Sequence, residues 1–380
     1  MTTAAKIKSQ RIGEGVDKKG VKKQFEGQVL SRVIRRTPEG YELEADLRHA
    51  ELIVEQLELQ SCSLVVTPGI DVEVKCTAWE DDEDEPEEDE LPAEECTRFR
   101  GIAARCNYLQ PDRPDIQYAV KEVCRLMSRP TARAWVLLKR IGRYLKGRPR
   151  LVWRYCWQAP VSIIDVTSDA NWAGCRRGRK STSGGTIMLG SHLIRTYSKT
   201  QSTIAKSSGE SELYAVVRAS AEGLGMATLL SDFGVPDPRV SVVMHASAAI
   251  GMAQRTGLNK VRHVEVDVLW IQEQQTRRML PIEKIPGPQN PSDLCTKNVP
   301  VGLLEQYMRQ LNVYFAAGRA AVAQHLHTVR RHDAPMFAAP AVGVLLAGVE
   351  GCREEPQVIA APAVGAFARW SYRRPGAGEK

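Results

Sequence analysis

Several features of well-known protein classes are absent from this sequence. Aromatic residues make up only 6% of the 380 residues, and no apolar run approaches the roughly 18 residues of a membrane-spanning helix. No basic segment followed by an apolar one opens the chain, so we expect an intracellular protein, cytoplasmic or nuclear, with no membrane partner. The nine cysteines form no CxxC pair and no cluster with histidine, which argues against a disulfide framework and against a zinc site. Reduced thiols are therefore predicted.

Charge is unevenly distributed along the chain, and the net charge of +7 hides this pattern. Residues 79–96 are almost entirely acidic or proline and are predicted to be a linker whose like charges repel. Residues 98–150, by contrast, hold fourteen Lys and Arg against three Asp and Glu. Basic clustering of this density favours contact with nucleic-acid phosphates, although a solvated basic helix face remains the alternative.

The first part of the chain is predicted to be largely helical. Residues 1–28 are Lys-rich and aperiodic, so we interpret them as a basic flexible arm. Apolar residues recur at helical spacing over 47–59, 98–109, 116–127 and 135–145, with proline-rich breaks between the last three. Residues 30–35 and 61–76 have the composition of strands, and 97–155 as a whole has a helical pattern.

Residues 159–298 are predicted to form an α/β domain. The β-branched run at 160–166 is followed by two strands, 184–190 and 192–198, which the Gly190-Ser191 turn joins. Ser207 precedes a long helix that runs to about residue 230. A buried strand at 240–244, helices at 247–254 and 264–279, and a last strand at 280–285 complete a mixed five-stranded sheet with helices on both faces.

A series of linked motifs runs through this region and the helical region before it. The motifs are Arg113-Pro-Asp-Ile-Gln-Tyr-Ala-Val120, Met127-Ser-Arg-Pro-Thr131, Arg140-Ile-Gly-Arg-Tyr-Leu-Lys-Gly147, Ser168-Asp-Ala-Asn-Trp-Ala-Gly174, Lys180-Ser-Thr-Ser-Gly-Gly185, Ser198-Lys-Thr-Gln201, Ser207-Ser-Gly-Glu-Ser-Glu-Leu-Tyr-Ala215, Ser247-Ala-Ala-Ile250, Arg262-His263 and Pro291-Ser-Asp-Leu-Cys-Thr-Lys297. The first three resemble the end of the reverse transcriptase of copia-type retrotransposon Pol polyproteins, and the others resemble the ribonuclease H domain of the same polyproteins. The resemblance implies a ribonuclease H-like domain at 159–298, preceded by a helical reverse-transcriptase connection region at 29–78 and 97–158.

The family's chemistry is hydrolysis of the RNA strand of an RNA–DNA hybrid by two Mg²⁺ or Mn²⁺ ions held by four acids. The matching positions here are Asp169, Glu212 and Asp293, with His245 where family members have an Asp. A neutral imidazole binds Mg²⁺ poorly and Mn²⁺ better, so we expect impaired Mg²⁺-dependent cleavage. Glu210 is expected to point outward or back to the helix cap. The expected nucleic-acid contacts are Arg176, Arg177, Arg179, Lys180, Lys199 and Arg262.

Other interpretations of the same residues stay open. Taken singly, Asp169 is explained as a turn former, Glu212 as an exposed helix acid and Asp293 as an acid at a helix N-terminus. The domain as a whole could also be a non-catalytic RNA- or hybrid-binding relic, or, less favoured, a DNA-strand-transfer enzyme on the same fold. No Tyr-x-Asp-Asp motif occurs, so polymerase activity is not expected.

The last part of the chain resembles nothing in the family. Residues 303–326 have a helical pattern, and the region beyond is rich in Ala, Pro, Gly and Val. The hexapeptide Ala338-Ala-Pro-Ala-Val-Gly343 recurs at residues 360–365. We interpret 299–380 as a low-complexity tail that is partly disordered.

Overall fold

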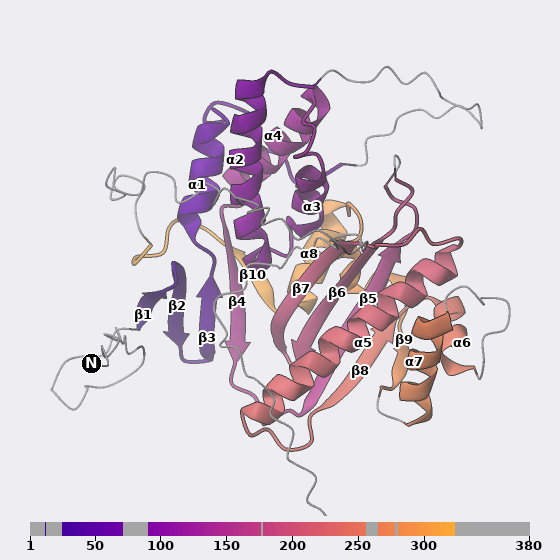
Figure 1. Ribbon diagram of the computed structural model, residues 1–380. Coiled ribbons are helices and arrows are strands. Elements are labelled where there is room, and N and C mark those ends of the chain that lie inside the picture. Colours follow the sequence, from indigo (N-terminus) through magenta and orange to yellow (C-terminus); the bar gives the residue numbers. More distant parts are fainter. Residues whose placement is uncertain are drawn as a thin grey trace, which may run out of the picture. The chain divides into compact units, whose positions relative to one another are not determined.

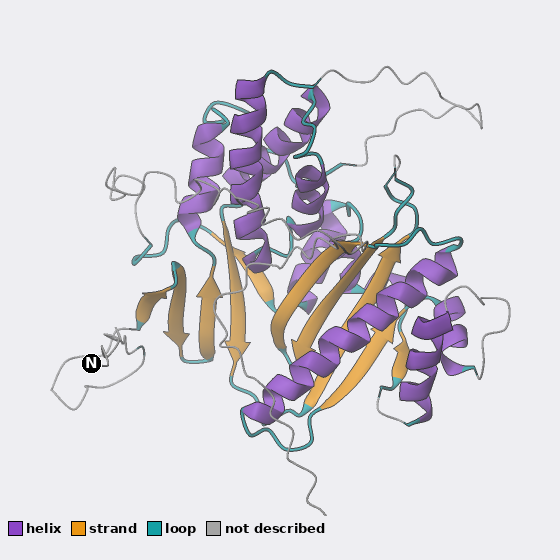
Figure 2. Cartoon of the chain, viewed as in Figure 1, coloured by secondary structure: helices purple, strands orange, loops and turns teal. Residues whose placement is uncertain are grey.

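A computed structural model describes residues 12, 25–70, 90–175, 178–255, 265–277 and 280–323 (Figure 1). These residues contain two five-stranded sheets and the helices that pack on them (Figure 2). Most of the basic arm predicted at 1–28, most of the acidic linker predicted at 79–96 and the tail beyond residue 323 lie outside the described residues. The last residues of the predicted arm belong to the strand Glu26–Val29, so the prediction of a flexible arm is wrong there.

The sheet of the predicted ribonuclease H-like domain is mixed, and its strand order is β7-β6-β5-β8-β9. β5, β6 and β7 are consecutive antiparallel neighbours, while β8 runs parallel to β5 and β9 runs parallel to β8. The mixed five-stranded sheet predicted from the sequence is therefore confirmed. The strands are β5 (Ile163–Asn171), β6 (Thr182–Leu189), β7 (His192–Thr200), β8 (Arg239–Met244) and β9 (Ile282–Lys284).

One face of this sheet is covered by the long helix α5 (Ser208–Asp232), beside which lie α6 (Ser247–Gln254) and α7 (Glu265–Thr276), as Figure 1 shows. Leu213 and Val216 of α5 belong to the same buried core as Ile164 and Val166 of β5, because their apolar side chains recur on one helical face. Burial of such side chains fixes the helix against the strand that carries Asp169.

The opposite face is covered by short elements from distant parts of the sequence. The 3₁₀ helix η4 (Pro291–Cys295) lies against β5 and β6, and α3 (Gln117–Arg125) lies against β7. The helix α8 (Val301–Gln310) shares a core with η4 and with Leu193 of β7. Helices therefore cover both faces of the sheet, as predicted.

The region before residue 158 contains the four predicted helices and most of a second sheet. Of this sheet, the sequence predicted only the strand at 30–35. The helices are α1 (Leu47–Gln56), α2 (Ala93–Leu109), α3 and α4 (Ala132–Gly147), with η1 (Gln110–Asp112) after α2; they bury one shared core. The sheet has the order β1-β2-β3-β4-β10 and is antiparallel. Its strands are β1 (Glu26–Val29), β2 (Arg32–Thr37), β3 (Gly40–Glu44), β4 (Arg150–Cys156) and β10 (Val313–Ala316).

Three local predictions were wrong. The helical pattern assigned to 97–155 includes β4, and the one assigned to 303–326 includes β10, because these two segments pair with each other across the sequence. The acidic linker predicted at 79–96 ends earlier than expected, because α2 begins at Ala93. Glu94 and Glu95 suit the first turn of a helix. Of the strand composition noted at 61–76, residues 61–70 form loop, and residues 71–76 lie outside the described residues.

The start of the predicted tail also differs from the structure. Residues 301–316 form α8 and β10, whose buried side chains complete the core beside β4 and β7. The seven cysteines that the structure describes are all free thiols. Among the described residues, no helix is long and apolar enough to cross a membrane.

Candidate metal centre

Asp169 lies near the end of β5 and is buried, with 1% of its surface exposed. The sequence suggested that it follows the strand, but β5 extends to Asn171 and Asp169 pairs with Gly184 of β6. On its other side, β8 runs parallel to β5 with Ser168 opposite Met244. Asp169 is the next residue of β5, and His245 is the residue that directly follows β8, so the register brings the two side chains close together.

Glu212 comes from the second turn of α5, whose N-cap is Ser207 as predicted. Its side chain is buried and directed at the end of β5. Glu210, two residues earlier, accepts hydrogen bonds from the backbone N–H of Lys206 at 3.0 Å and from the hydroxyl of Tyr214 at 3.4 Å. The two glutamates therefore have different surroundings, and the prediction that Glu210 turns back to the cap is confirmed.

Asp169, Glu212 and His245 form one cluster. One ligand atom from each lies within 4.8 Å of the others. Nδ1 of His245 is 3.6 Å from Oδ1 of Asp169, and Nε2 is 3.9 Å from Oε1 of Glu212. The imidazole thus stands between the two carboxylates, at the position where the resemblance implies a third carboxylate.

Asp293 is adjacent to this cluster but is held by other partners. Its Oδ2 accepts a hydrogen bond from the hydroxyl of Tyr307 at 3.2 Å, and its Oδ1 lies 2.9 Å from Nζ of Lys297. The same Nζ lies 3.7 Å from Oδ2 of Asp169, which also accepts a hydrogen bond from Thr296. Lys297 therefore stands between two of the predicted metal-binding acids.

Burial and mutual repulsion disturb the titration of these acids. Desolvation, followed by the nearby charge of Asp169, raises the pKa of Glu212 to about 8. The same two causes, in the same order, raise the pKa of Asp293, while Lys297 opposes the rise. The surrounding residues thus neutralise only part of the negative charge of the site, which favours binding of a cation.

The residues present fit a divalent metal ion. Oε2 of Glu212 is buried and has no hydrogen-bond partner among the described residues, although buried carboxylate oxygens are normally satisfied. Two carboxylates and one imidazole are also a donor set that suits Mn²⁺ better than Mg²⁺, since Mg²⁺ prefers oxygen. A cation held by Asp169, Glu212 and His245 would satisfy the unpaired oxygen.

Asn290 and Thr296 support the site and were not assigned this role from the sequence. The amide of Asn290 donates to the carbonyl of Ser168 at 2.9 Å and lies 3.2 Å from Nδ1 of His245. Its Oδ1 accepts from the N–H of Ser292, so Asn290 caps η4 and its amide nitrogen is the donor toward the ring. Lys297 was also missed, although its spacing of four residues after Asp293 is the spacing of side-chain pairs on a helix.

Three of the predicted nucleic-acid contacts lie at the same end of the sheet as Asp169. Arg179 and Lys180 belong to the connection between β5 and β6, which leaves the sheet where Asn171 pairs with Thr182. Lys199 is exposed on β7 opposite Ser183. The other three, Arg176, Arg177 and Arg262, lie outside the described residues.

No protein-family model matches this chain. The chain is 29% identical over 219 residues to the retrovirus-related Pol polyprotein from transposon RE2 of Arabidopsis thaliana, a match that covers 57% of the chain and 15% of the polyprotein. It is 30% identical over 189 residues to the polyprotein from transposon TNT 1-94 of Nicotiana tabacum, covering 50% of the chain and 14% of that polyprotein. The chain is thus similar to part of the Pol polyproteins of copia-type retrotransposons. Its match spans under a sixth of the length of these relatives.

Solved structures with similar folds include ribonucleases H and a reverse transcriptase. LC11-RNase H1, isolated from compost by a metagenomic approach, has 18% identity and a TM-score of 0.29, covering 36% of this chain and 93% of its own. The foamy viral protease-reverse transcriptase, solved in complex with an RNA/DNA hybrid, has 12% identity and a TM-score of 0.37, covering 74% of this chain and 31% of its own. In this chain the mixed sheet and its covering helices make up the predicted ribonuclease H-like domain.

Proposed function

We propose that the ribonuclease H-like domain at 159–298 is a divalent-metal-dependent nuclease domain that hydrolyses the RNA strand of RNA–DNA hybrids, with cleavage in Mg²⁺ impaired by His245. The observation that carries this proposal is the cluster of Asp169, Glu212 and His245, whose ligand atoms lie within 4.8 Å of one another. Asp169 lies on β5, His245 directly follows the neighbouring parallel strand β8, and Glu212 comes from the helix that packs on them. The fold itself therefore assembles the cluster.

In this proposal Asp169, Glu212 and His245 bind the cation, and Asp293 contributes a carboxylate beside it. A bound divalent ion supplies the activation of a water molecule and the neutralisation of charge on the scissile phosphate. Asn290 holds the His245 ring by a contact to Nδ1, and Thr296 orients Asp169. The chain's own residues thus position the ligands before any ion binds.

The substrate class is the one implied by the family, and the position of Arg179, Lys180 and Lys199 supports it. These cations lie at the end of the sheet that carries Asp169, where a nucleic-acid backbone would reach the carboxylates. Lys and Arg at that position favour a polyanion through release of its counterions.

Impairment in Mg²⁺ follows from the charge of the ligands. His245 supplies no negative charge in its neutral form and offers nitrogen to an ion that prefers oxygen. Mn²⁺ accepts nitrogen more readily, so the same site is expected to work better with Mn²⁺. His245 also favours a second candidate function, which is binding of RNA or hybrids without cleavage.

The test is cleavage of a labelled RNA–DNA hybrid by the full chain in Mg²⁺ and in Mn²⁺, with His245→Asp beside the natural protein. We expect His245→Asp to cleave at least tenfold faster than the natural chain in Mg²⁺, and the natural chain to cleave faster in Mn²⁺ than in Mg²⁺. Binding of the hybrid by both proteins with cleavage by neither would favour the binding function. Full Mg²⁺ activity of the natural chain would contradict the impairment.

A further inference from the structure

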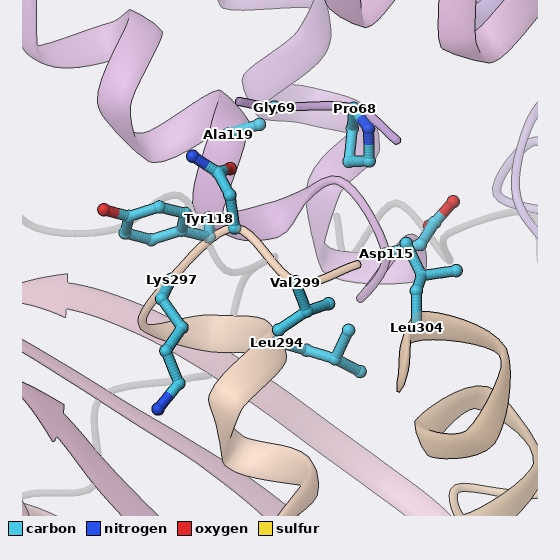
Figure 3. Close-up of a pocket in the computed structure, with 10 residues that line it drawn as sticks. Pro68, Gly69, Asp115, Tyr118, Ala119, Leu294, Lys297, Val299 and Leu304 are labelled. Atoms are coloured by element: carbon cyan, nitrogen blue, oxygen red, sulfur yellow. The ribbon is translucent and has the colours of Figure 1, made fainter. Parts of the chain in front are cut away.

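Lys297 lies where two carboxylates of the metal centre face each other. Its Nζ is 2.9 Å from Oδ1 of Asp293 and 3.7 Å from Oδ2 of Asp169. Figure 3 shows the side chain extending from the backbone after η4, away from Pro68 and Gly69, with its amino group at the far end. The ammonium thus places a fixed positive charge between Asp169 and Asp293.

The two oxygens of Asp169 face different neighbours. Oδ1 faces Nδ1 of His245, on the side of the cluster that includes Glu212. Oδ2 faces Lys297 and accepts a hydrogen bond from Thr296. Asp169 therefore joins two separate sites for positive charge, one lined by His245 and Glu212 and the other by Asp293.

The second of these sites already holds a positive charge. Oδ2 of Asp293 is hydrogen-bonded by Tyr307, and Oδ2 of Asp169 by Thr296. Oδ1 of Asp293 has no hydrogen-bond partner among the described residues, but it is ion-paired with Lys297, whose Nζ lies 2.9 Å away. A divalent ion at this point would have to displace the ammonium, which already neutralises part of the local charge. At the first site, Oε2 of Glu212 has no hydrogen-bond partner among the described residues.

We propose that this chain binds a single divalent ion, held by Asp169, Glu212 and His245, and that the Lys297 ammonium takes the place of a second ion between Asp169 and Asp293. This inference rests on the proposed metal centre and departs from the two ions that the family resemblance implies. Lys297 is a positioning residue in this scheme, because its charge holds the two carboxylates together without an ion between them.

The number of bound ions tests this proposal without any measurement of cleavage. The full chain is dialysed against Mn²⁺, and bound Mn²⁺ is counted by electron paramagnetic resonance. The same count for Asp169→Asn is subtracted, so that ions on the acidic segment at 79–96 do not contribute. We expect one ion for the natural chain and two for Lys297→Met, which keeps the apolar stem of the side chain and removes the charge.

Lys199→Met is the matched control, because it removes an exposed lysine of the same domain and is expected to leave the count at one. Lys297→Gln provides a second variant of the same position if Lys297→Met does not fold by circular dichroism. Two ions on the natural chain, or one ion on the folded Lys297 variants, would overturn the inference and leave the metal centre intact. Absence of ions from every protein, His245→Asp included, would overturn the metal centre as well.

Discussion

Nδ1 of His245 lies 3.6 Å from Oδ1 of Asp169 at one edge of the sheet, where Asp169 is on β5 and His245 directly follows the parallel strand β8. Their contact follows from the register of β5 and β8, in which Ser168 lies opposite Met244. A parallel pair of strands always presents its carboxyl ends at one edge of the sheet, so the residues that follow the register are brought together.

Glu212 and Glu210 form a matched pair with different expected roles. Glu212→Gln removes a charge from the cluster and is expected to lower Mn²⁺ affinity at least tenfold, because an amide is a weaker ligand than a carboxylate. Glu210→Gln is expected to leave Mn²⁺ affinity unchanged and to cost about 1 kcal/mol of stability, since Glu210 serves the helix cap. Isothermal titration calorimetry and urea unfolding measure the two effects, and equal losses of affinity would contradict the assignment.

The metal-free protein is expected to lose stability as the pH rises. The raised pKa of Glu212, about 8 against an ordinary 4.5, means that the folded chain keeps a proton that the unfolded chain releases. Stability from this group is therefore fully present below about pH 4.5 and is lost as the pH rises to about 8, with a slope of up to about 1.4 kcal/mol per pH unit. Urea unfolding in EDTA, repeated between pH 5 and pH 8, measures this loss of stability. Glu212→Gln should have the flatter profile, and identical profiles would show that Glu212 does not carry the effect.

Gly184 permits the close approach of η4 to β6. A Cβ atom at this position would lie 2.6 Å from Cγ2 of Thr296 and 2.7 Å from Cβ of Cys295. Gly184→Ala is therefore expected to destabilise the fold by about 1–3 kcal/mol and to weaken Mn²⁺ binding, since Thr296 contacts Asp169.

Gly225→Ala is the control for that substitution. Nothing lies within 4 Å of the added methyl group in α5, so a gain of about 0.5–1 kcal/mol is expected from helix propensity alone. Thermal unfolding of Gly184→Ala and Gly225→Ala measures the difference between their stabilities. A neutral Gly184→Ala would show that η4 does not need this contact to hold Asp293.

Arg113 ties the helical region together and is fully buried. Its guanidinium donates two hydrogen bonds to Asp115, at 2.8 and 2.6 Å, and also reaches the carbonyls of Arg148 and Pro149. Arg113→Met is expected to cost about 3–5 kcal/mol, because Asp115 would remain buried without its partner. The double variant Arg113→Met with Asp115→Ala should recover part of that loss in urea unfolding. A single-variant loss below 1 kcal/mol would contradict this role.

Local signals in the sequence predicted the ribonuclease H-like domain well. The β-branched run before Asp169, the Gly190-Ser191 turn and the cap at Ser207 depend on neighbours only a few residues away, and each forms as predicted. The motifs also identified three acids and the histidine. Residue type and short spacing were enough for these features, because local backbone preferences determine them.

Pairing between distant segments was decided only by the tertiary structure. β4 and β10 were predicted to be helical, yet Trp153 pairs with Val313 across the sequence and both are buried in one core. Lys297 carried no assigned role until the fold placed it between Asp169 and Asp293. The sequence by itself determined which ligands are available and that His245 is not an acid. The tertiary structure decided which of them lie close enough to share a cation, because that depends on distances between side chains from β5, α5, the residue after β8 and the segment at η4.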